Sequence, residues 1–178
     1  LGRSAILPGA LDLDNGSNWT TTDTPTEGRV AVAKTGEVPA GTITTGETKP
    51  ALIVDLVGAT YPGSGDRLDR FQVTNLGTMA AADLQQVRLW LDVNGDSLLD
   101  GGDSPVADLA WDGTGWGNSA ILLSDLNAWG QFIVTIQLQD TATNGATFQA
   151  QVPVHAAATA YADSGPIAAV SAANALTA

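Results

Sequence analysis

The chain has 178 residues, of which 44% are hydrophobic and 15% are charged, and its formal net charge is −12. This composition describes a folded chain of ordinary domain size and excludes an intrinsically disordered one. The acidic balance, with a sequence pI of about 4.1, excludes nucleic acid and anionic membrane surfaces as partners, because both carry negative charge themselves.

Cysteine is absent, so the chain has no disulfide framework and its redox compartment cannot be read from thiols. The longest apolar runs are far shorter than the roughly 20 residues of a membrane-spanning helix, and we therefore expect no membrane span. The first residue is Leu1 and not methionine. We expect an extracellular or cell-surface protein from which a signal segment has been removed.

Residues 1–27 form an N-terminal arm and linker that differ in pattern from the rest of the chain. An apolar arm over residues 1–13 precedes a polar stretch rich in Thr, Asp, Asn and Gly, which is typical of a linker. Exposed aliphatic side chains promote aggregation, so the arm is expected to be buried as a donor strand in a second copy. Its four aliphatic residues are Ile6, Leu7, Leu11 and Leu13. The alternative is that the arm is the first strand of its own sandwich.

The linker also carries candidate modification sites. Asn15 and Asn18 each begin an acceptor sequence for N-glycosylation. Asp12 and Asp14 offer a second, partial ion site, although a solvated turn is the simpler interpretation of these residues.

Residues 28–178 read as one β-sandwich domain. Val87, Leu89 and Leu91 alternate with Arg88 and Trp90, which is the period of a strand. In residues 131–139 one face of a strand carries Phe132, Val134, Ile136 and Leu138, and the other carries Ile133, Thr135, Gln137 and Gln139. Residues 51–57 read as a fully buried strand, and 147–154 as a strand that pairs with 131–139. About nine short strands separated by turn residues predict an all-β, immunoglobulin-like antiparallel β-sandwich.

The stretch from Asp92 to Asp103 has the spacing of a calcium loop. Oxygen-bearing side chains fall at loop positions one, three, five, nine and twelve, and a main-chain carbonyl falls at position seven: Asp92, Asn94, Asp96, Asp100, Asp103 and Leu98. Position six is Ser97 where the standard loop has Gly, and position twelve is Asp instead of Glu. The residues that flank the loop have the pattern of strands and not of helices. We therefore expect the calcium ion to be structural and to stabilise the connection between two strands. The other interpretation is an ordinary Asp- and Asn-rich turn.

Residues 88–111, which include LWLDVNGDSLLDGGDSPVADLAW, resemble the calcium-binding B-type repeats of serine-aspartate-repeat surface adhesins. The resemblance implies an immunoglobulin-like stalk domain on a bacterial surface, with calcium held by Asp92, Asn94, Asp96, Asp100 and Asp103. In that family the signature opens the domain, whereas here it lies in the middle of the chain.

The sequence predicts no enzyme. The single histidine, His155, lies among small apolar residues at the end of a predicted strand, where a structural role is expected. The chain has no Gly-x-Ser-x-Gly motif and no glycine-rich phosphate loop before a helix. The densest group of carboxylates is already accounted for by the calcium loop.

Five tryptophans support a competing hypothesis, a calcium-containing carbohydrate-binding module. Aromatic rings on one surface can stack on sugars, and the candidates are Trp90, Trp111, Trp116 and Trp129. The alternative places Trp90 and Trp129 in the core or on a sheet face. We expect a structural subunit of an extracellular fibre or pilus-like filament, a homopolymer of identical subunits, with a polysaccharide as the partner in the alternative.

Overall fold

The computed structural model describes residues 13–14, 16–18, 30–57, 66–124, 130–160 and 164–178. Strands dominate these residues, and their one helical element is a 3-10 turn, η1 (Ala81–Asp83). In the same residues no helix is long and apolar enough to span a membrane. Two short strands, β2 (Leu13–Asp14) and β3 (Gly16–Asn18), precede the sandwich in sequence.

The first sheet of the sandwich has five strands, all antiparallel to their neighbours. In spatial order they are β4 (Ala31–Lys34), β6 (Thr48–Val57), β12 (Gln131–Leu138), β8 (Leu84–Asp92) and β9 (Ser104–Asp108). The predicted alternation is confirmed in β8, where Val87, Leu89 and Leu91 join the main core. In β12 the predicted core face of Phe132, Val134, Ile136 and Leu138 is buried, but Ile133 and Thr135 on the opposite face are buried as well.

The second sheet packs against the first and is made of shorter strands. Its path runs through β10 (Ala110–Trp111), β11 (Trp116–Asn118), β7 (Leu68–Asn75), β14 (Ala150–Val152) and β16 (Val170–Ser171), and β15 (Ala158–Thr159) also pairs with β7. A further small sheet contains β13 (Thr147–Phe148), β17 (Leu176–Thr177) and β5 (Gly41–Thr42). Strands β17 and β5 run parallel. The predicted pairing of residues 147–154 with 131–139 is wrong, because β13 pairs with β17 and β14 pairs with β7 and β16, in the sheets opposite β12.

The strand order is that of an immunoglobulin domain. In chain order, β4, β6, β7, β8, β12, β14 and β16 take the places of strands A to G, so the sheets read A-B-E-D and C-F-G. Strands β9, β10 and β11 are additions between D and E. The immunoglobulin-like, all-β prediction is therefore confirmed, with the ladders divided into more and shorter strands than the nine expected.

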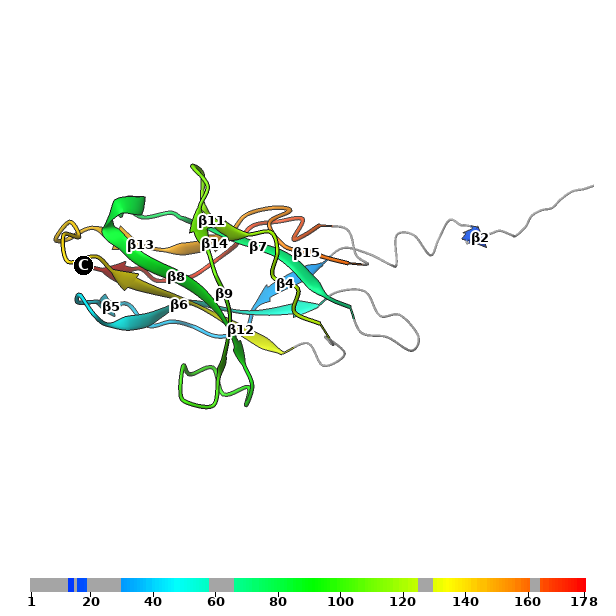
Figure 1. Cartoon of the computed structure of the whole chain (residues 1–178), viewed down its shortest axis with the longest axis horizontal. Coiled ribbons are helices and arrows are strands. Elements are labelled where there is room, and N and C mark those ends of the chain that lie inside the picture. The colour runs from blue at the N-terminus through cyan, green and yellow to red at the C-terminus, as the bar shows by residue number, and fades with distance from the viewer. Residues whose placement is uncertain (1–12, 15, 19–29, 58–65, 125–129, 161–163) are drawn as a thin grey trace, which may run out of the picture.

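The main core lies between the two sheets. Its largest members, Phe71, Phe132 and Phe148, are fully buried and come from β7, β12 and β13. Figure 1 shows the sandwich elongated, with β5 and the C-terminus at one end and β4 and β15 towards the other. The loop between β8 and β9 projects from the body.

A second apolar cluster lies on the outer face of the first sheet. Ile53, Ile133 and Trp90 face one another across β6, β12 and β8. Val38 and Leu99, which are outside these strands, pack against them. At this cluster the first sheet is therefore apolar on both of its faces. The loop after β8 covers the outer face there through Leu99.

Candidate functional site

The candidate metal loop starts from the outer face of the first sheet. Asp92 is the last residue of β8 and lies opposite Gln131 of β12, which lies opposite Asp55 of β6. These three residues form the row next to the apolar cluster. Asp92 is buried although it carries a carboxylate, so its oxygens require partners.

Main-chain amides of the loop itself supply those partners. The Asp92 Oδ1 and Oδ2 atoms accept hydrogen bonds from the amides of Gly95 (2.6 Å) and Ser97 (2.8 Å). Asn94 Oδ1 accepts one from the Asp96 amide at 3.1 Å, and Asp96 Oδ1 accepts one from the Leu98 amide at 2.8 Å. The first half of the loop is therefore a series of turns, each closed by a predicted ligand residue.

The second half of the loop is closed in the same way. Asp100 Oδ1 accepts a hydrogen bond from the Gly102 amide at 2.6 Å. Asp103 Oδ2 accepts one from the Asp100 amide at 2.9 Å, and its Oδ1 accepts one from the Val93 amide at 3.3 Å. The last predicted ligand thus ties the end of the loop to its beginning.

Ser97, the departure from the standard loop, takes the conformation that glycine would take. Its φ angle is 68°, in the left-handed region. A standard loop has glycine at this sixth position because a sharp turn is needed there. The Ser97 hydroxyl donates to Gln131 Oε1 at 2.6 Å, and Gln131 Nε2 donates to Thr35 Oγ1 at 2.9 Å. The sheet therefore holds this residue in place.

The charge of the loop is not balanced by side chains. Among the described residues, the ion pairs involve none of the loop carboxylates Asp92, Asp96, Asp100 and Asp103. As placed, the described residues contain no group of three or more His, Cys, Asp or Glu side chains close enough to hold a metal. A carboxylate oxygen that accepts one amide hydrogen keeps a lone pair for a second partner. The residues offer the oxygen donors that calcium prefers, and an ion would have to draw them together.

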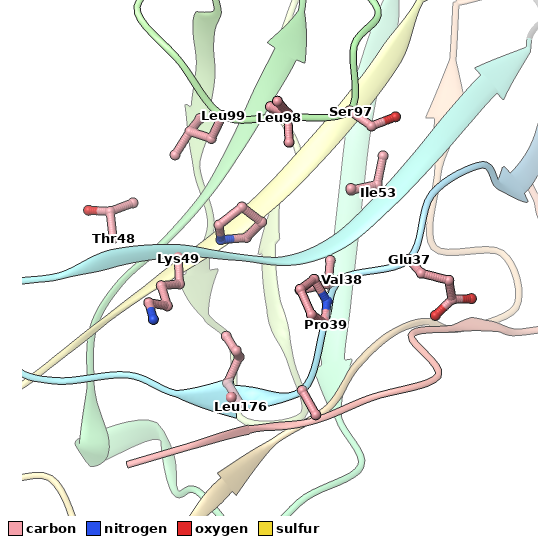
Figure 2. A pocket seen from close by; sticks show the side chains of 13 residues that line it. Glu37, Val38, Pro39, Thr48, Lys49, Ile53, Ser97, Leu98, Leu99 and Leu176 are labelled. Carbon is pink, nitrogen blue, oxygen red and sulfur yellow. The ribbon is translucent and has the colours of Figure 1, made fainter.

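The loop also forms one wall of a groove. Leu99 packs on the outer-face cluster, and the Leu98 side chain is 63% exposed beside it. The groove has a volume of about 420 Å³ and continues along β6 to residues 37–41 and Leu176. Figure 2 shows Leu98 and Leu99 on one side of β6, and Pro39 and Leu176 on the other.

A second groove, of about 430 Å³, lies between the edge strands β4 and β16. Its lining residues are all apolar and come from residues 30–32 and 166–170. Ile167, in this lining, is 75% exposed. In the described residues one groove therefore runs along β6 beside the loop, and a wholly apolar one lies between β4 and β16.

The tryptophans in the described residues do not form one platform. Trp116 is buried, with its ring centroid 4.6 Å from that of Trp111 and 5.5 Å from that of Phe148. Trp90 lies on the outer face of the other sheet and donates from Nε1 to Thr135 Oγ1 at 2.9 Å. Trp111 remains 47% exposed, and Trp129 lies outside the described residues.

Two other acidic residues serve as anchors of turns. Hydrogen bonds from the amides of Ala80 and Thr143 hold the pKa of the buried Asp83 carboxyl below its usual value. Hydrogen bonds from Thr114 and the Gly115 amide lower the pKa of Asp112 in the same way. Each of these two carboxylates holds a nearby turn in place by accepting hydrogen bonds from main-chain amides.

His155 is exposed at the end of the segment that follows β14. Its φ angle is 57°, and its Nδ1 atom lies 3.1 Å from the Ser164 carbonyl oxygen. Its own carbonyl oxygen accepts a hydrogen bond from Arg70 Nη2 at 2.5 Å. These contacts connect His155 to Ser164 and to Arg70 of β7, and they fit the structural role expected of this residue.

Several predicted residues lie outside the described part of the chain. These are Ile6, Leu7 and Leu11 of the donor strand, Asp12, and the glycosylation candidate Asn15. Leu13 and Asp14 fall in β2 and Asn18 falls in β3, where only the main chain is described.

No protein-family model, curated protein or solved structure matches this chain. The resemblance of residues 88–111 to an adhesin repeat therefore stays a prediction, as do the calcium site and the surface location.

Proposed function

We propose that the protein is a structural subunit of an extracellular surface fibre, which polymerises when residues 1–13 of one copy dock on the next. One observation carries this proposal. Residues 30–178 supply all seven strands of an immunoglobulin sandwich, from β4 as strand A to β16 as strand G. The apolar arm before them is therefore not needed to complete the strand order of its own domain.

The energy of docking is sufficient for a stable contact. Each aliphatic side chain of the arm contributes roughly 1.5–3 kcal/mol when it is buried. An extended segment also gains main-chain hydrogen bonds when it pairs with an open sheet edge, and it protects that edge from other partners. Contacts of this kind, repeated head to tail, do not close on themselves and so build a filament.

Calcium in this proposal has a structural role. The side-chain oxygens of Asp92, Asn94, Asp96, Asp100 and Asp103 and the main-chain carbonyl of Leu98 would hold the ion. Its positive charge would offset four carboxylates that have no basic partner in the described residues. It would also fix a loop that packs on the outer face of the first sheet through Leu99.

Light scattering of the purified full-length chain over a range of concentrations tests the proposal. A structural subunit should give a mass that grows with concentration and far exceeds that of one chain. A monomer at every concentration would contradict the proposal.

A calcium-containing carbohydrate-binding module is the second candidate, and one observation favours it. Trp111 exposes its ring on the second sheet, beside a small hollow of about 270 Å³ that Asn75, Met79 and Thr114 also line. An exposed aromatic ring can stack on a sugar. Trp116 also lines this hollow, but only 5% of it is exposed, so it offers little ring surface for stacking.

A further inference from the structure

One edge of β6 in the first sheet is paired over only half of its length. Strand β4 pairs with Val54–Val57 of β6, and the Thr35 amide donates to the Ile53 carbonyl at 3.4 Å. The chain then leaves β6 and pairs as β5 with β17. Over Thr48–Leu52, β6 therefore pairs with β12 on one side and, in the part of the chain that the structure describes, with no strand on the other.

This gap coincides with the groove beside the metal loop. Thr48, Lys49 and Pro50 line the groove along its floor. Apolar side chains form both walls, Leu98 and Leu99 on one side and Pro39 and Leu176 on the other (Figure 2). An unpaired strand edge between two apolar walls is what a docking extended segment requires.

We propose that this groove, beside Thr48–Leu52 of β6, is the acceptor site for residues 1–13 of a second copy of the chain. The inference rests on the proposed function and adds the site at which one subunit receives the next. The incoming segment would pair with β6 beyond the end of β4, along Thr48–Leu52, and would so extend the first sheet.

The sequence of the arm fits this site. Leu11 and Leu13 are two positions apart, so an extended chain would present both on one side, with Asp12 pointing away. Ile6 and Leu7 precede Pro8 and Gly9, which interrupt this alternation. Arg3 and Asp12 are the charged side chains of residues 1–13 and cancel each other, so the acidic body does not repel the arm as a whole.

The position of the groove favours a head-to-tail arrangement. The arm joins the sandwich at Val30, next to the pair of Ala31 with Val57 at one end of β6. The groove runs from Ile53 to Thr48, so it begins about 13 Å from Val57 and ends about 30 Å from it. Figure 1 shows β4 and β5 towards opposite ends of the molecule. An arm that leaves one end and a site near the other give a heterologous contact.

Cross-linking of full-length protein tests the inference, since the natural chain has no cysteine. One preparation carries Ala40→Cys in the groove lining, and a second, isotope-labelled preparation carries Leu7→Cys, Leu11→Cys or Leu13→Cys. The two are mixed, allowed to assemble and oxidised. We expect disulfide-linked pairs of one labelled and one unlabelled chain, identified by mass spectrometry, for at least one arm position.

The other groove supplies the matched control. Ile167→Cys replaces Ala40→Cys in the same mixture, and little cross-linking is expected there. Ala40→Arg, which fills the proposed site, should abolish assembly, whereas Ile167→Arg should leave it intact.

The outcomes separate this inference from the proposed function. Assembly with cross-links only to Ile167→Cys, or assembly that survives Ala40→Arg, overturns the acceptor site and leaves the fibre proposal standing. A further variant carries both Leu11→Cys and Ala40→Cys in the same chain. If its disulfides form only within single chains, the arm docks on its own subunit and the acceptor site for a second copy is overturned. A full-length protein that stays monomeric by sedimentation overturns both proposals.

Discussion

Ser97 in the projecting loop donates its hydroxyl hydrogen to the side-chain carbonyl of Gln131 in the central strand of the first sheet, with 2.6 Å between Oγ and Oε1. Gln131 in turn donates to the Thr35 hydroxyl just beyond β4. The sixth position of the loop is thereby tied to β12 and to the segment that follows β4.

This relationship makes substitutions of Ser97 informative. Ser97→Ala removes a hydrogen bond worth about 1 kcal/mol and keeps a side chain in the left-handed region. Ser97→Gly removes the same bond but relieves a backbone cost of roughly 1–2 kcal/mol. We expect the alanine variant to be less stable than the glycine variant by about 1 kcal/mol in urea denaturation. Equal stabilities, or the reverse order, would contradict the left-handed conformation at this position.

Calcium should stabilise the folded protein. An ion that binds only the native state stabilises it by about 2.7 kcal/mol at one hundred times its dissociation constant. Chelation should therefore lower the melting temperature, and Asp96→Ala should lose the response to calcium. Asp140→Ala, at an exposed carboxylate outside the loop, is the control and should respond as the wild type does. A wild-type melting curve that neither calcium nor chelator changes would rule out the site.

Asp83 should make stability depend on pH. In the folded state its pKa is lowered, first by the hydrogen bond from the Ala80 amide and then by that from the Thr143 amide. A group with a lowered folded-state pKa adds stability above its unfolded-state pKa, and this is lost as the pH falls through the folded-state value.

Asp83→Asn should therefore cost about 1–3 kcal/mol at neutral pH, because the amide nitrogen cannot accept from Ala80. The difference from wild type should shrink as the pH falls below the usual range for aspartate. Urea denaturation of both proteins at several pH values measures it, with Asp140→Asn as the exposed control. A difference that stays constant over the acidic range would show that the Asp83 charge does not contribute.

The two neighbouring tryptophans should behave differently. Trp116→Ala should destabilise the fold by about 3–5 kcal/mol, since it empties a buried position next to Phe148. Trp111→Ala should leave the fold largely intact because that ring is half exposed. Retention of wild type on a polysaccharide, lost in a folded Trp111→Ala variant, would favour the carbohydrate-binding candidate over the fibre subunit.

The sequence predicts the fold well where the hydrophobic period within a single strand is enough to show which side chains face the core. The core face of β8, with Val87, Leu89 and Leu91, could be read directly from its period of two. The core face of β12 could be read in the same way, but the burial of its opposite face at Ile133 and Thr135 could not, because the loop after β8 and the chain after β4 cover it. The prediction that strands flank the loop from Asp92 to Asp103 is confirmed by β8 and β9. The spacing of the loop residues was readable for the same local reason.

The groove could not be predicted, because its residues come from four separate parts of the chain, one of them Leu176 near the C-terminal end. Residues 37–41, 48–53 and 97–99 meet only after β4 has left β6 and the loop has folded back on the sheet. Two adjacent leucines, Leu98 and Leu99, inside an otherwise polar loop were the one local signal. The role of Gln131 had no such signal, since a glutamine on a strand is usually solvated.

The central claim is that residues 1–13 connect one subunit to the next, and electron microscopy of the full-length protein tests it most directly. Wild type is compared with a variant carrying Leu11→Asp and Leu13→Asp, and with Ser4→Asp as a control for added charge in the same arm. The account predicts filaments for wild type and for Ser4→Asp, and single folded subunits, with an unchanged circular dichroism spectrum, for the double variant. Dispersed monomers in the wild-type preparation, or filaments that persist in the double variant, would contradict it.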